Sequence, residues 1–380
     1  MHSPWQDPEV TALGRLPATA SLHRSDSDLI QLDSTWKFQL CMHPAEVPAD
    51  WHSLDTQTWL DVELPHLWTM DSRLNEDNPI YTNVVMPFRH EPPALPSKNP
   101  TGIYRRTITV PENWLDDRLV IHVGGVESFF FLYCNGHEVG YAKDSKLPSE
   151  FDLTRYLTSG TNELALQVIK YCDASYIEDQ DHWWHGGIHR SVYLYRTPQV
   201  FIQDVFITPD FEPASSRGNL DTRIRIGGKD RAALNHTIEA QLRSPQDKPL
   251  GRPVSESISR SEFNYVIGKG PVVDLALPWR KVSPWSAETP ALYELEVSLR
   301  DDVGDVLETF RFWVGFRRIE IRDRELLVNG TAILIRGVNR HDHHPDSGRV
   351  MTREDIQKDI LQMKRHNINA IRTSHYPTHS

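Results

Sequence analysis

RLVIHVGGVESFFFLYCNGHEVGY, residues 118–141, is the stretch that decides the fold of the first half of this chain. It consists of short β-branched and aromatic runs, which favour strands. Asn135-Gly136 separates two of these runs, and this dipeptide is a strong signal for a hairpin turn. Comparable runs follow one another from 28 to 198, with almost no helical period between them. The pattern predicts an antiparallel jelly-roll β-sandwich over 28–198.

Residues 1–27 precede this region and differ from it. They are polar, contain proline and show no sustained hydrophobic period. We expect them to form an N-terminal arm that lies over another part of the protein. The sequence does not indicate which part that is.

A second region of β pattern follows, over 199–322. Its clearest strand lies in ALYELEVSLRDD (291–302), where Leu295, Val297 and Leu299 alternate with polar residues. This alternation predicts one buried face and one face in water. Roughly 120 residues suit a small immunoglobulin-like β-sandwich.

The pattern changes again at Glu325. LLVNGTAILIRGV (326–338) predicts two apolar strands around the turn at Asn329-Gly330. Thr352 and Asp355 then resemble a capping box at the start of an amphipathic helix. An extended run, INAIRTSHYP (368–377), follows the helix, so the unit is strand, helix, strand.

Two strands joined by a helix run parallel, and their carboxyl ends lie at the same edge. The HDHH segment (341–344) and Ser374-His375-Tyr376 are therefore expected to meet, as site residues do in barrel enzymes. About 55 residues supply one βαβ unit, whereas a closed (β/α)8 TIM barrel takes about 250. We interpret 323–380 as the truncated start of such a barrel. With open strand edges and an exposed apolar helix face, it is expected to be disordered, aggregated or docked on another chain.

The bulk composition excludes several classes of protein. The net charge of -11 in 380 residues argues against a nucleic-acid partner, which normally requires a basic face. Three well-separated cysteines do not form a disulfide framework and favour a reducing compartment. Nowhere do about 18 apolar residues run together, so a membrane partner is not expected. A cytoplasmic location is the default expectation.

Two polar clusters are candidate sites. His341, His343 and His344 are compatible with a metal site, with sugar contacts or with a structural polar loop. YIEDQDHWW (176–184) places three acids beside two tryptophans, which suits a sugar site but also suits a solvated charge run. Arg372, on the last strand, is either an ion-pair partner inside the barrel or a substrate contact. Asn99, in Asn-Pro-Thr-Gly, is by default a turn residue.

Taken together, the segments resemble the β-galactosidases of glycoside hydrolase family 2. The resemblance spans nearly the whole chain, and two of its blocks are highly specific. It is carried by PIYTNVVMPF (79–88), NPTGIYRR (99–106), the stretch from GYAKDSKLPSEFDL (140–153) to YIEDQDHWWHGGIHRSVYL (176–194), VGFRRIEI (314–321), LIRGVNRHDHHP (334–345) and DILQMKRHNINAIRTSHYPTH (359–379). It implies a multidomain, mainly β chain: a jelly-roll sugar-binding domain, an immunoglobulin-like domain and the start of a (β/α)8 barrel.

The resemblance also assigns residues. It implies that His341 and His375 contact the galactosyl unit, that Asn99 reaches over the pocket and that Arg372 supports the site. Asp181 takes the position of the aspartate that binds galactose hydroxyls and helps to hold Na⁺. Both catalytic glutamates, and most ligands of the active-site Mg²⁺, correspond to barrel strands beyond Ser380. We therefore expect no catalytic residue in this chain.

The implied parent activity is hydrolysis of terminal β-galactosides such as lactose with retention of configuration. This chain is expected to be an N-terminal part that is inactive alone. Its expected protein partners are copies of itself, since the long family members form tetramers, or a complementing C-terminal chain. Two alternatives stay open, a non-catalytic carbohydrate-binding chain and a metal-dependent TIM-barrel hydrolase. β-Glucuronidase or β-mannosidase specificity fits the Asp-Gln-Asp and Asn-Pro-Thr-Gly blocks less well.

Overall fold

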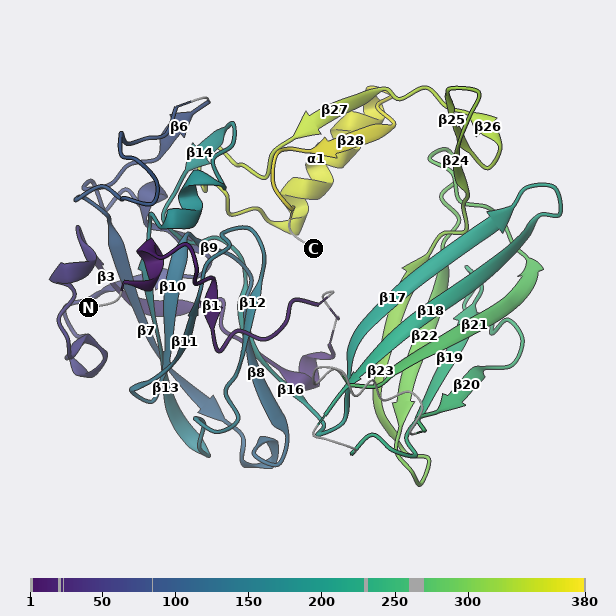
Figure 1. Cartoon of the computed structure of the whole chain (residues 1–380), viewed down its shortest axis with the longest axis horizontal. Helices are drawn as coiled ribbons and strands as arrows, with labels where there is room; N and C mark the ends of the chain where they lie inside the picture. The colour runs from purple at the N-terminus through teal and green to yellow at the C-terminus, as the bar shows by residue number, and fades with distance from the viewer. Residues whose placement is uncertain are drawn as a thin grey trace. The chain divides into compact units, whose positions relative to one another are not determined.

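The computed structural model describes residues 3–19, 22, 24–83, 85–228, 232–259 and 270–378. They form two compact units (Figure 1). The first unit comprises the described parts of 1–18, 26–196 and 337–380, and the second comprises those of 19–25 and 197–336. The mainly β fold confirms the predicted fold class. The predicted domain boundaries at 27, 198 and 322 stay a prediction.

The first unit is built on a jelly-roll sandwich of two large antiparallel sheets. Within the described residues the larger sheet has seven strands, in the order β1 (Ala12–Leu13), β11 (His137–Ala142), β10 (Phe129–Cys134), β13 (Gly160–Ile169), β7 (Thr101–Val110), β3 (Thr35–Cys41) and β4 (Leu60–Glu63). The other sheet has the order β12 (Ser149–Asp152), β8 (Arg118–Val123), β16 (Val192–Thr197) and β2 (Leu29–Gln31). The predicted turn at Asn135-Gly136 connects β10 to β11, and both turn residues have positive φ, as a type I′ turn requires.

Two smaller sheets extend the sandwich toward the candidate site. One has the order β5 (His66–Leu67), β15 (Gly187–Ile188) and β9 (Val126–Glu127), and the other is a ribbon of β6 (Ile80–Thr82) and β14 (His182–Trp184). Trp184 fastens this ribbon, because its indole N–H donates to the Thr82 hydroxyl at 2.6 Å. The ribbon places the acidic YIEDQD run next to strands of the sandwich.

The core of the sandwich is rich in large aromatic side chains. Trp36, Phe38, Trp68 and Tyr104 are each at most 1% exposed. Each such ring removes enough apolar surface from water to stabilise the fold by about 2–3 kcal/mol. This core gives the candidate site a rigid base.

The described part of 1–18, in the N-terminal arm, packs within the first unit. Strand β1 pairs with β11, placing Leu13 opposite Tyr141, and the Trp5 ring makes edge contacts with Phe129 and Phe131. The Lys143 ammonium donates to the Asp7 carbonyl at 2.7 Å. The arm therefore extends the seven-stranded sheet, which confirms that it lies over another part of the protein.

The second unit is a sandwich of the predicted immunoglobulin-like kind (Figure 1). One sheet contains β17 (Phe201–Glu212), β18 (Arg217–Gly227) and β21 (Val272–Lys281), and the other contains β20 (Val254–Ser257), β19 (Thr237–Arg243), β22 (Tyr293–Arg300) and β23 (Val306–Val314). On β22, Leu295, Val297 and Leu299 are fully buried as predicted. Ser298 of the opposite face is buried too, where it shares a hydrogen bond with Thr309.

A small three-stranded sheet ends the second unit. It contains β24 (Ile319–Arg322), β25 (Glu325–Val328) and β26 (Thr331–Ala332), with the predicted Asn329-Gly330 turn between the last two. The run that follows differs from the prediction. Residues 333–335 do not continue a strand and are exposed. The next strand begins at Gly337.

The predicted strand–helix–strand unit is present. Strand β27 (Gly337–Arg340) pairs in parallel with β28 (Ala370–Thr373), and α1 (Arg353–Arg365) connects them (Figure 1). The capping box is confirmed, since the Thr352 hydroxyl accepts from the Asp355 N–H and the Asp355 carboxylate accepts from the Thr352 N–H, both at 3.1 Å. Helix start and strand pairing thus follow from local sequence.

The apolar surface of this unit is exposed, as expected for one βαβ unit. Ile360, Leu361 and Ile371 are each 40–47% exposed. The expectation of disorder, aggregation or docking on another chain stays a prediction. The described residues from 337 onward group with the jelly-roll strands of the same chain. The Pro377 carbonyl accepts from Arg190, and Arg349 donates to the Trp183 carbonyl.

Two further predictions concern bulk properties. The three cysteines are buried and carry free thiols, as the sequence indicated. Among the described residues, no helix is both long and apolar enough to cross a membrane.

The pairing of the arm depends on a glycine. A Cβ at Gly140 would lie 2.0 Å from the Leu13 carbonyl oxygen, so Gly140→Ala must push β1 away from β11. We expect cleavage by trypsin after Arg15 to become about 10- to 100-fold faster, because a cost of about 1–3 kcal/mol raises the open population by that order. Leu13→Ala is the matched control, because its side chain is half exposed and its backbone pairing is retained. Equal cleavage rates in the two variants would contradict the prediction.

Candidate functional site

A pocket lies where the βαβ loops meet the jelly roll, with a volume of about 240 Å³. Its walls come from the β6–β14 ribbon and from the loops that follow β27 and β28. The lining residues are Tyr81, Asp181, His182, Trp183, His341, His343, Arg349 and Tyr376. The two polar clusters singled out in the sequence therefore share one cavity, which we call the candidate pocket.

His341 and His375 face each other beside this pocket. Their ring centroids are 5.1 Å apart and their planes are nearly perpendicular, at 87°. The prediction that the carboxyl ends of the two strands bring them together is confirmed. Burial and the neighbouring His375 lower the pKa of His341, although Asp181 opposes this. A neutral imidazole both donates and accepts a hydrogen bond, which suits contact with a hydroxyl group.

Asp181 is the one carboxylate in the pocket lining. It accepts a hydrogen bond from the Tyr81 hydroxyl at 2.5 Å, and this bond raises the pKa of Tyr81. A carboxylate that keeps acceptor capacity in an open pocket can bind further hydroxyl groups.

Aromatic rings stand beside Asp181. The Trp183 ring centroid lies 5.4 Å from that of Tyr81. It lies 5.6 Å from that of His343, on which the ring is stacked with an interplanar angle of 20°. Trp183 is 39% exposed and Tyr81 is 50% exposed, so both rings have surface free for a ligand. A carboxylate next to accessible rings is the combination that a pyranose sugar requires.

Asn99 does not line the candidate pocket. It is 2% exposed. The Asn99 amide N–H donates to the Tyr171 carbonyl oxygen, and the Asn99 amide oxygen accepts from the Tyr171 N–H, both at 2.9 Å. In this geometry Asn99 fixes the loop before β7. Both ends of the amide are paired with Tyr171, and the reach of Asn99 over the pocket stays a prediction.

Arg372 lies on β28 outside the pocket lining. It is exposed and donates to the Ser374 hydroxyl at 3.0 Å and, more weakly, to the Asn339 side chain on the neighbouring strand at 3.4 Å. This placement is compatible with the supporting role that was predicted, and it includes no carboxylate partner.

The histidine cluster does not converge on one point. His341 faces His375, His343 stacks between Trp183 and His185, and His344 pairs its backbone with Gly348 to close a turn. Within the described part of the chain, no group of three or more His, Cys, Asp or Glu residues is placed to hold a metal ion. Sugar contact for His341 and structural roles for the other two agree best with this arrangement.

Asp342, in the same segment, has partners that were not anticipated. It is 4% exposed and accepts hydrogen bonds from Arg340 at 2.5 Å and from the Thr378 hydroxyl at 2.8 Å. Its backbone carbonyl also accepts from the Tyr376 hydroxyl at 3.1 Å. Asp342 ties the loop after β27 to the loop after β28.

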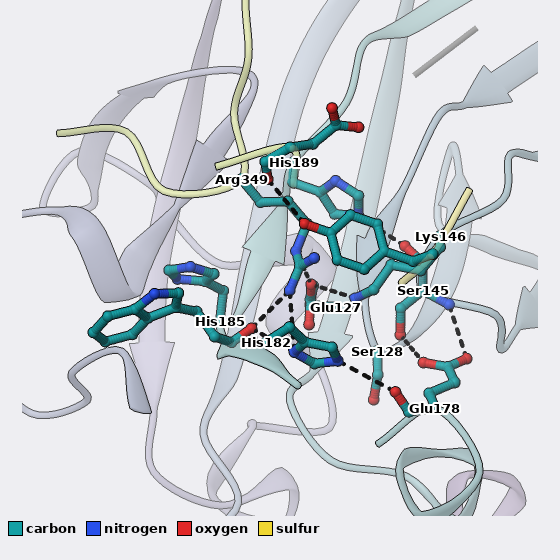
Figure 2. Close-up of polar contacts among 12 residues, drawn as sticks. Glu127, Ser128, Ser145, Lys146, Glu178, His182, His185, His189 and Arg349 are labelled. Atoms are coloured by element: carbon teal, nitrogen blue, oxygen red, sulfur yellow. Dashed lines mark hydrogen bonds and ion pairs between the residues drawn. The ribbon is translucent and has the colours of Figure 1, made fainter. Parts of the chain in front are cut away.

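Beneath the pocket lies an ionic cluster that the sequence analysis missed. The Glu127 carboxylate, on β9, lies 2.6 Å from the Lys146 ammonium and 2.6 Å from Nε of Arg349 (Figure 2). All three side chains are at most 8% exposed. One feature of the sequence could have indicated this cluster. Glu127 is the one acid inside the apolar run GGVESFFF, and a carboxylate that is buried requires a cationic partner.

The charges in this cluster control its protonation. Burial alone would raise the pKa of Glu127, but Arg349 and Lys146 hold it well below its usual range. Burial and Arg349 lower the pKa of Lys146 to about 8, against the opposing effect of Glu127. The carboxylate is therefore ionised and compensates two nearby cations.

Several buried histidines are neutral. Burial and the cations Lys146 and Arg349 lower the pKa of His182 to about 4, and the pKa values of His185 and His189 lie well below the usual range. Figure 2 shows these three histidines close to Glu127, Lys146 and Arg349, so a proton on any of them would add to an already positive region. His66 lies apart, beside Asp71, and burial lowers its pKa to about 4 against the effect of that carboxylate.

The resemblance implies Na⁺ and Mg²⁺. Asp181 supplies one hard oxygen ligand of the kind that Na⁺ accepts. Among the described residues it does not belong to a group of three or more His, Cys, Asp or Glu residues placed to hold a metal ion. For Mg²⁺, the described residues offer no such cluster at all.

The ionic cluster predicts a large effect of Glu127→Gln. The variant leaves Lys146 and Arg349 buried without a compensating charge, which costs about 3–5 kcal/mol. Urea unfolding of the 380-residue chain measures the loss. Glu163→Gln is the control, because Glu163 pairs with Arg105 at a partly exposed position and does not contact the cluster. A loss below about 1 kcal/mol for Glu127→Gln would contradict the ion-pair interpretation.

The buried histidines predict instability in acid. Their pKa values are lower in the folded chain than in the unfolded chain, so the unfolded chain binds more protons between about pH 6.5 and pH 4. This stability is fully present above about pH 6.5 and is lost as the pH falls. Each imidazole shifted to about 4 removes roughly 3 kcal/mol by pH 4. Unfolding midpoints at pH 7, 6, 5 and 4.5 test this, and His182→Gln should weaken the dependence. Midpoints that do not change with pH would contradict it.

Comparison with known protein families gives three collinear matches. Residues 29–198 match the family model described as glycosyl hydrolases family 2, sugar binding domain. Residues 200–317 match the model described as glycosyl hydrolases family 2, and residues 319–380 match its TIM barrel domain. Together the matches run along almost the whole chain.

Curated relatives agree with these matches. The β-galactosidase of Photobacterium profundum is 40% identical over 390 residues, and that of Vibrio vulnificus (strain YJ016) is 40% identical over 392 residues. Each alignment covers 99% of this chain and 37% of the relative. The chain therefore spans about 37% of the length of these relatives.

Solved structures show the same fold. Bacteroides uniformis β-glucuronidase 2 matches with a TM-score of 0.74 and 23% identity, covering 92% of this chain and 40% of that protein. A putative β-galactosidase from Bacteroides fragilis matches with a TM-score of 0.73 and 19% identity, covering 92% and 50%. At this level of identity the likeness concerns the fold.

Proposed function

As the chain belongs to glycosyl hydrolases family 2, we propose that it forms the sugar-binding part of a β-galactosidase. The candidate pocket binds the terminal β-galactosyl unit of a substrate such as lactose. Asp181 accepts the sugar hydroxyls, His341 and His375 contact them from the βαβ loops, and Trp183 covers an apolar face of the ring. The observation that carries the proposal is the meeting of Asp181, His341 and exposed aromatic rings in one cavity.

The same pocket does not complete the chemistry of cleavage. A retaining glycosidase needs two carboxyl groups about 5–5.5 Å apart, one to donate a proton and one to act as nucleophile. The pocket lining described above contains one carboxylate. We infer that the described residues bind the galactoside, and that catalytic glutamates come from a further segment in the same or a complementing chain.

The finer assignments extend this proposal. A Na⁺ ion at Asp181 would place positive charge beside the sugar hydroxyls, and Mg²⁺ would be held by residues outside those described. The curated relatives support a galactoside as the substrate class. The complete enzyme is proposed to work as a homo-oligomer in the cytoplasm.

Titration of the purified chain with methyl β-galactoside tests the proposal. Asp181→Asn should weaken binding by at least about tenfold, because hydrogen bonds to a charged acceptor contribute about 1.5–3 kcal/mol. Asp179→Asn is the matched control, two positions away in the same acidic run and outside the pocket lining. Nitrophenyl β-galactoside should not be turned over by the chain alone.

Two outcomes would overturn this assignment. If the unaltered chain binds no galactoside, or if Asp179→Asn weakens binding as much as Asp181→Asn, the pocket is not the sugar site. Robust hydrolysis by the isolated chain would show that the catalytic acids lie within it.

A further inference from the structure

Arg349 lies at the base of the candidate pocket and contacts both of its sides. We propose that Arg349 is a positioning residue for the galactoside site, holding Trp183 and Tyr376 in place while Glu127 holds its own side chain. The inference rests on the proposed function and adds a residue to which the resemblance gave no role. It is carried by the contacts of one buried guanidinium.

These contacts point in different directions. Nε lies 2.6 Å from the Glu127 carboxylate, while Nη2 donates to the Trp183 carbonyl oxygen at 2.6 Å. The guanidinium carbon lies 4.4 Å from the centre of the Tyr376 ring. The Nε–carboxylate contact is ionic rather than a well-aligned hydrogen bond. One planar group thus joins the jelly-roll strand β9, the β6–β14 ribbon and the loop after β28; Figure 2 shows Arg349 beside Glu127.

Both residues that Arg349 holds are pocket walls. Trp183 carries the ring that stacks on His343, and Tyr376 lies 6.0 Å from His341. Tyr376 also follows His375 directly in the chain. Moving either ring therefore moves the surfaces on which a sugar would rest. The Arg349 side chain borders the pocket but is only 1% exposed, so we assign it a role through the neighbours that it contacts.

The position of Lys146 makes this role testable without unfolding the chain. When Arg349 is replaced by methionine, the Glu127 carboxylate still faces the Lys146 ammonium at 2.6 Å. The buried charges then balance, one negative with one positive. Arg349→Met should therefore remain folded, unlike a variant that removes Glu127, and it removes the links to Trp183 and Tyr376.

Arg349→Lys separates geometry from charge. A lysine keeps the positive charge but has a single ammonium group at the end of a flexible stem. It cannot reach the Glu127 carboxylate, the Trp183 carbonyl and the face of Tyr376 together. We expect it to behave like Arg349→Met in ligand binding.

The first measurement is the affinity for methyl β-galactoside. Arg349→Met and Arg349→Lys should each bind about ten- to hundredfold more weakly, as expected for a displaced contact surface. Arg105→Met is the matched control, because Arg105 is a largely buried arginine paired with Glu163 and is outside the pocket lining. If Arg349→Lys binds like the unaltered chain, charge alone matters and the positioning role is wrong.

The second measurement needs no sugar, so it distinguishes failure of this inference from failure of the proposed function. The fluorescence of Trp183 is isolated as the difference between each chain and the same chain carrying Trp183→Phe. Quenching of this difference signal by acrylamide should increase in Arg349→Met and Arg349→Lys, and not in Arg105→Met. Unchanged quenching would overturn the positioning role, whether or not galactoside binds.

Discussion

The carboxylate of Glu127 faces two cations inside the protein, and much of the site depends on that balance. Taking a charge out of water costs several kcal/mol, so Lys146 and Arg349 are buried only because the carboxylate is between them. Lys146 belongs to the jelly roll, whereas Arg349 comes from the loop after β27. The pairing therefore joins the βαβ loops to the sandwich and closes the base of the pocket.

The pocket is built from two kinds of structure. The jelly roll below it has an aromatic core in which Trp68 and Tyr104 are fully buried, while its walls come from a two-stranded ribbon and two loops. Loops at the carboxyl ends of parallel strands present polar groups without disturbing the core. Asp342 strengthens this arrangement, because it joins the two loops through Thr378 and the Tyr376 hydroxyl. Binding groups can thus be fixed although only two parallel strands are present among the described residues.

In the proposed function, recognition of the sugar is separate from cleavage of the bond. Asp181, Trp183 and His341 provide an acceptor, an apolar ring and a neutral imidazole, which together suit a sugar. Cleavage with retention requires a second, closely placed carboxyl group. The family matches are consistent with this proposal, since they include the sugar binding domain over 29–198 and the TIM barrel domain over 319–380.

The sequence by itself determined the two sandwiches, the turns at Asn135-Gly136 and Asn329-Gly330, the capping box and the strand–helix–strand unit. These features follow from hydrophobic period and turn chemistry, which act over a few residues. The tertiary structure decided which polar groups meet. It paired Asn99 with the backbone of Tyr171, and it placed Glu127 between cations from distant segments. No local pattern determines such partners, because the energy of a buried charge depends on what the whole fold brings beside it.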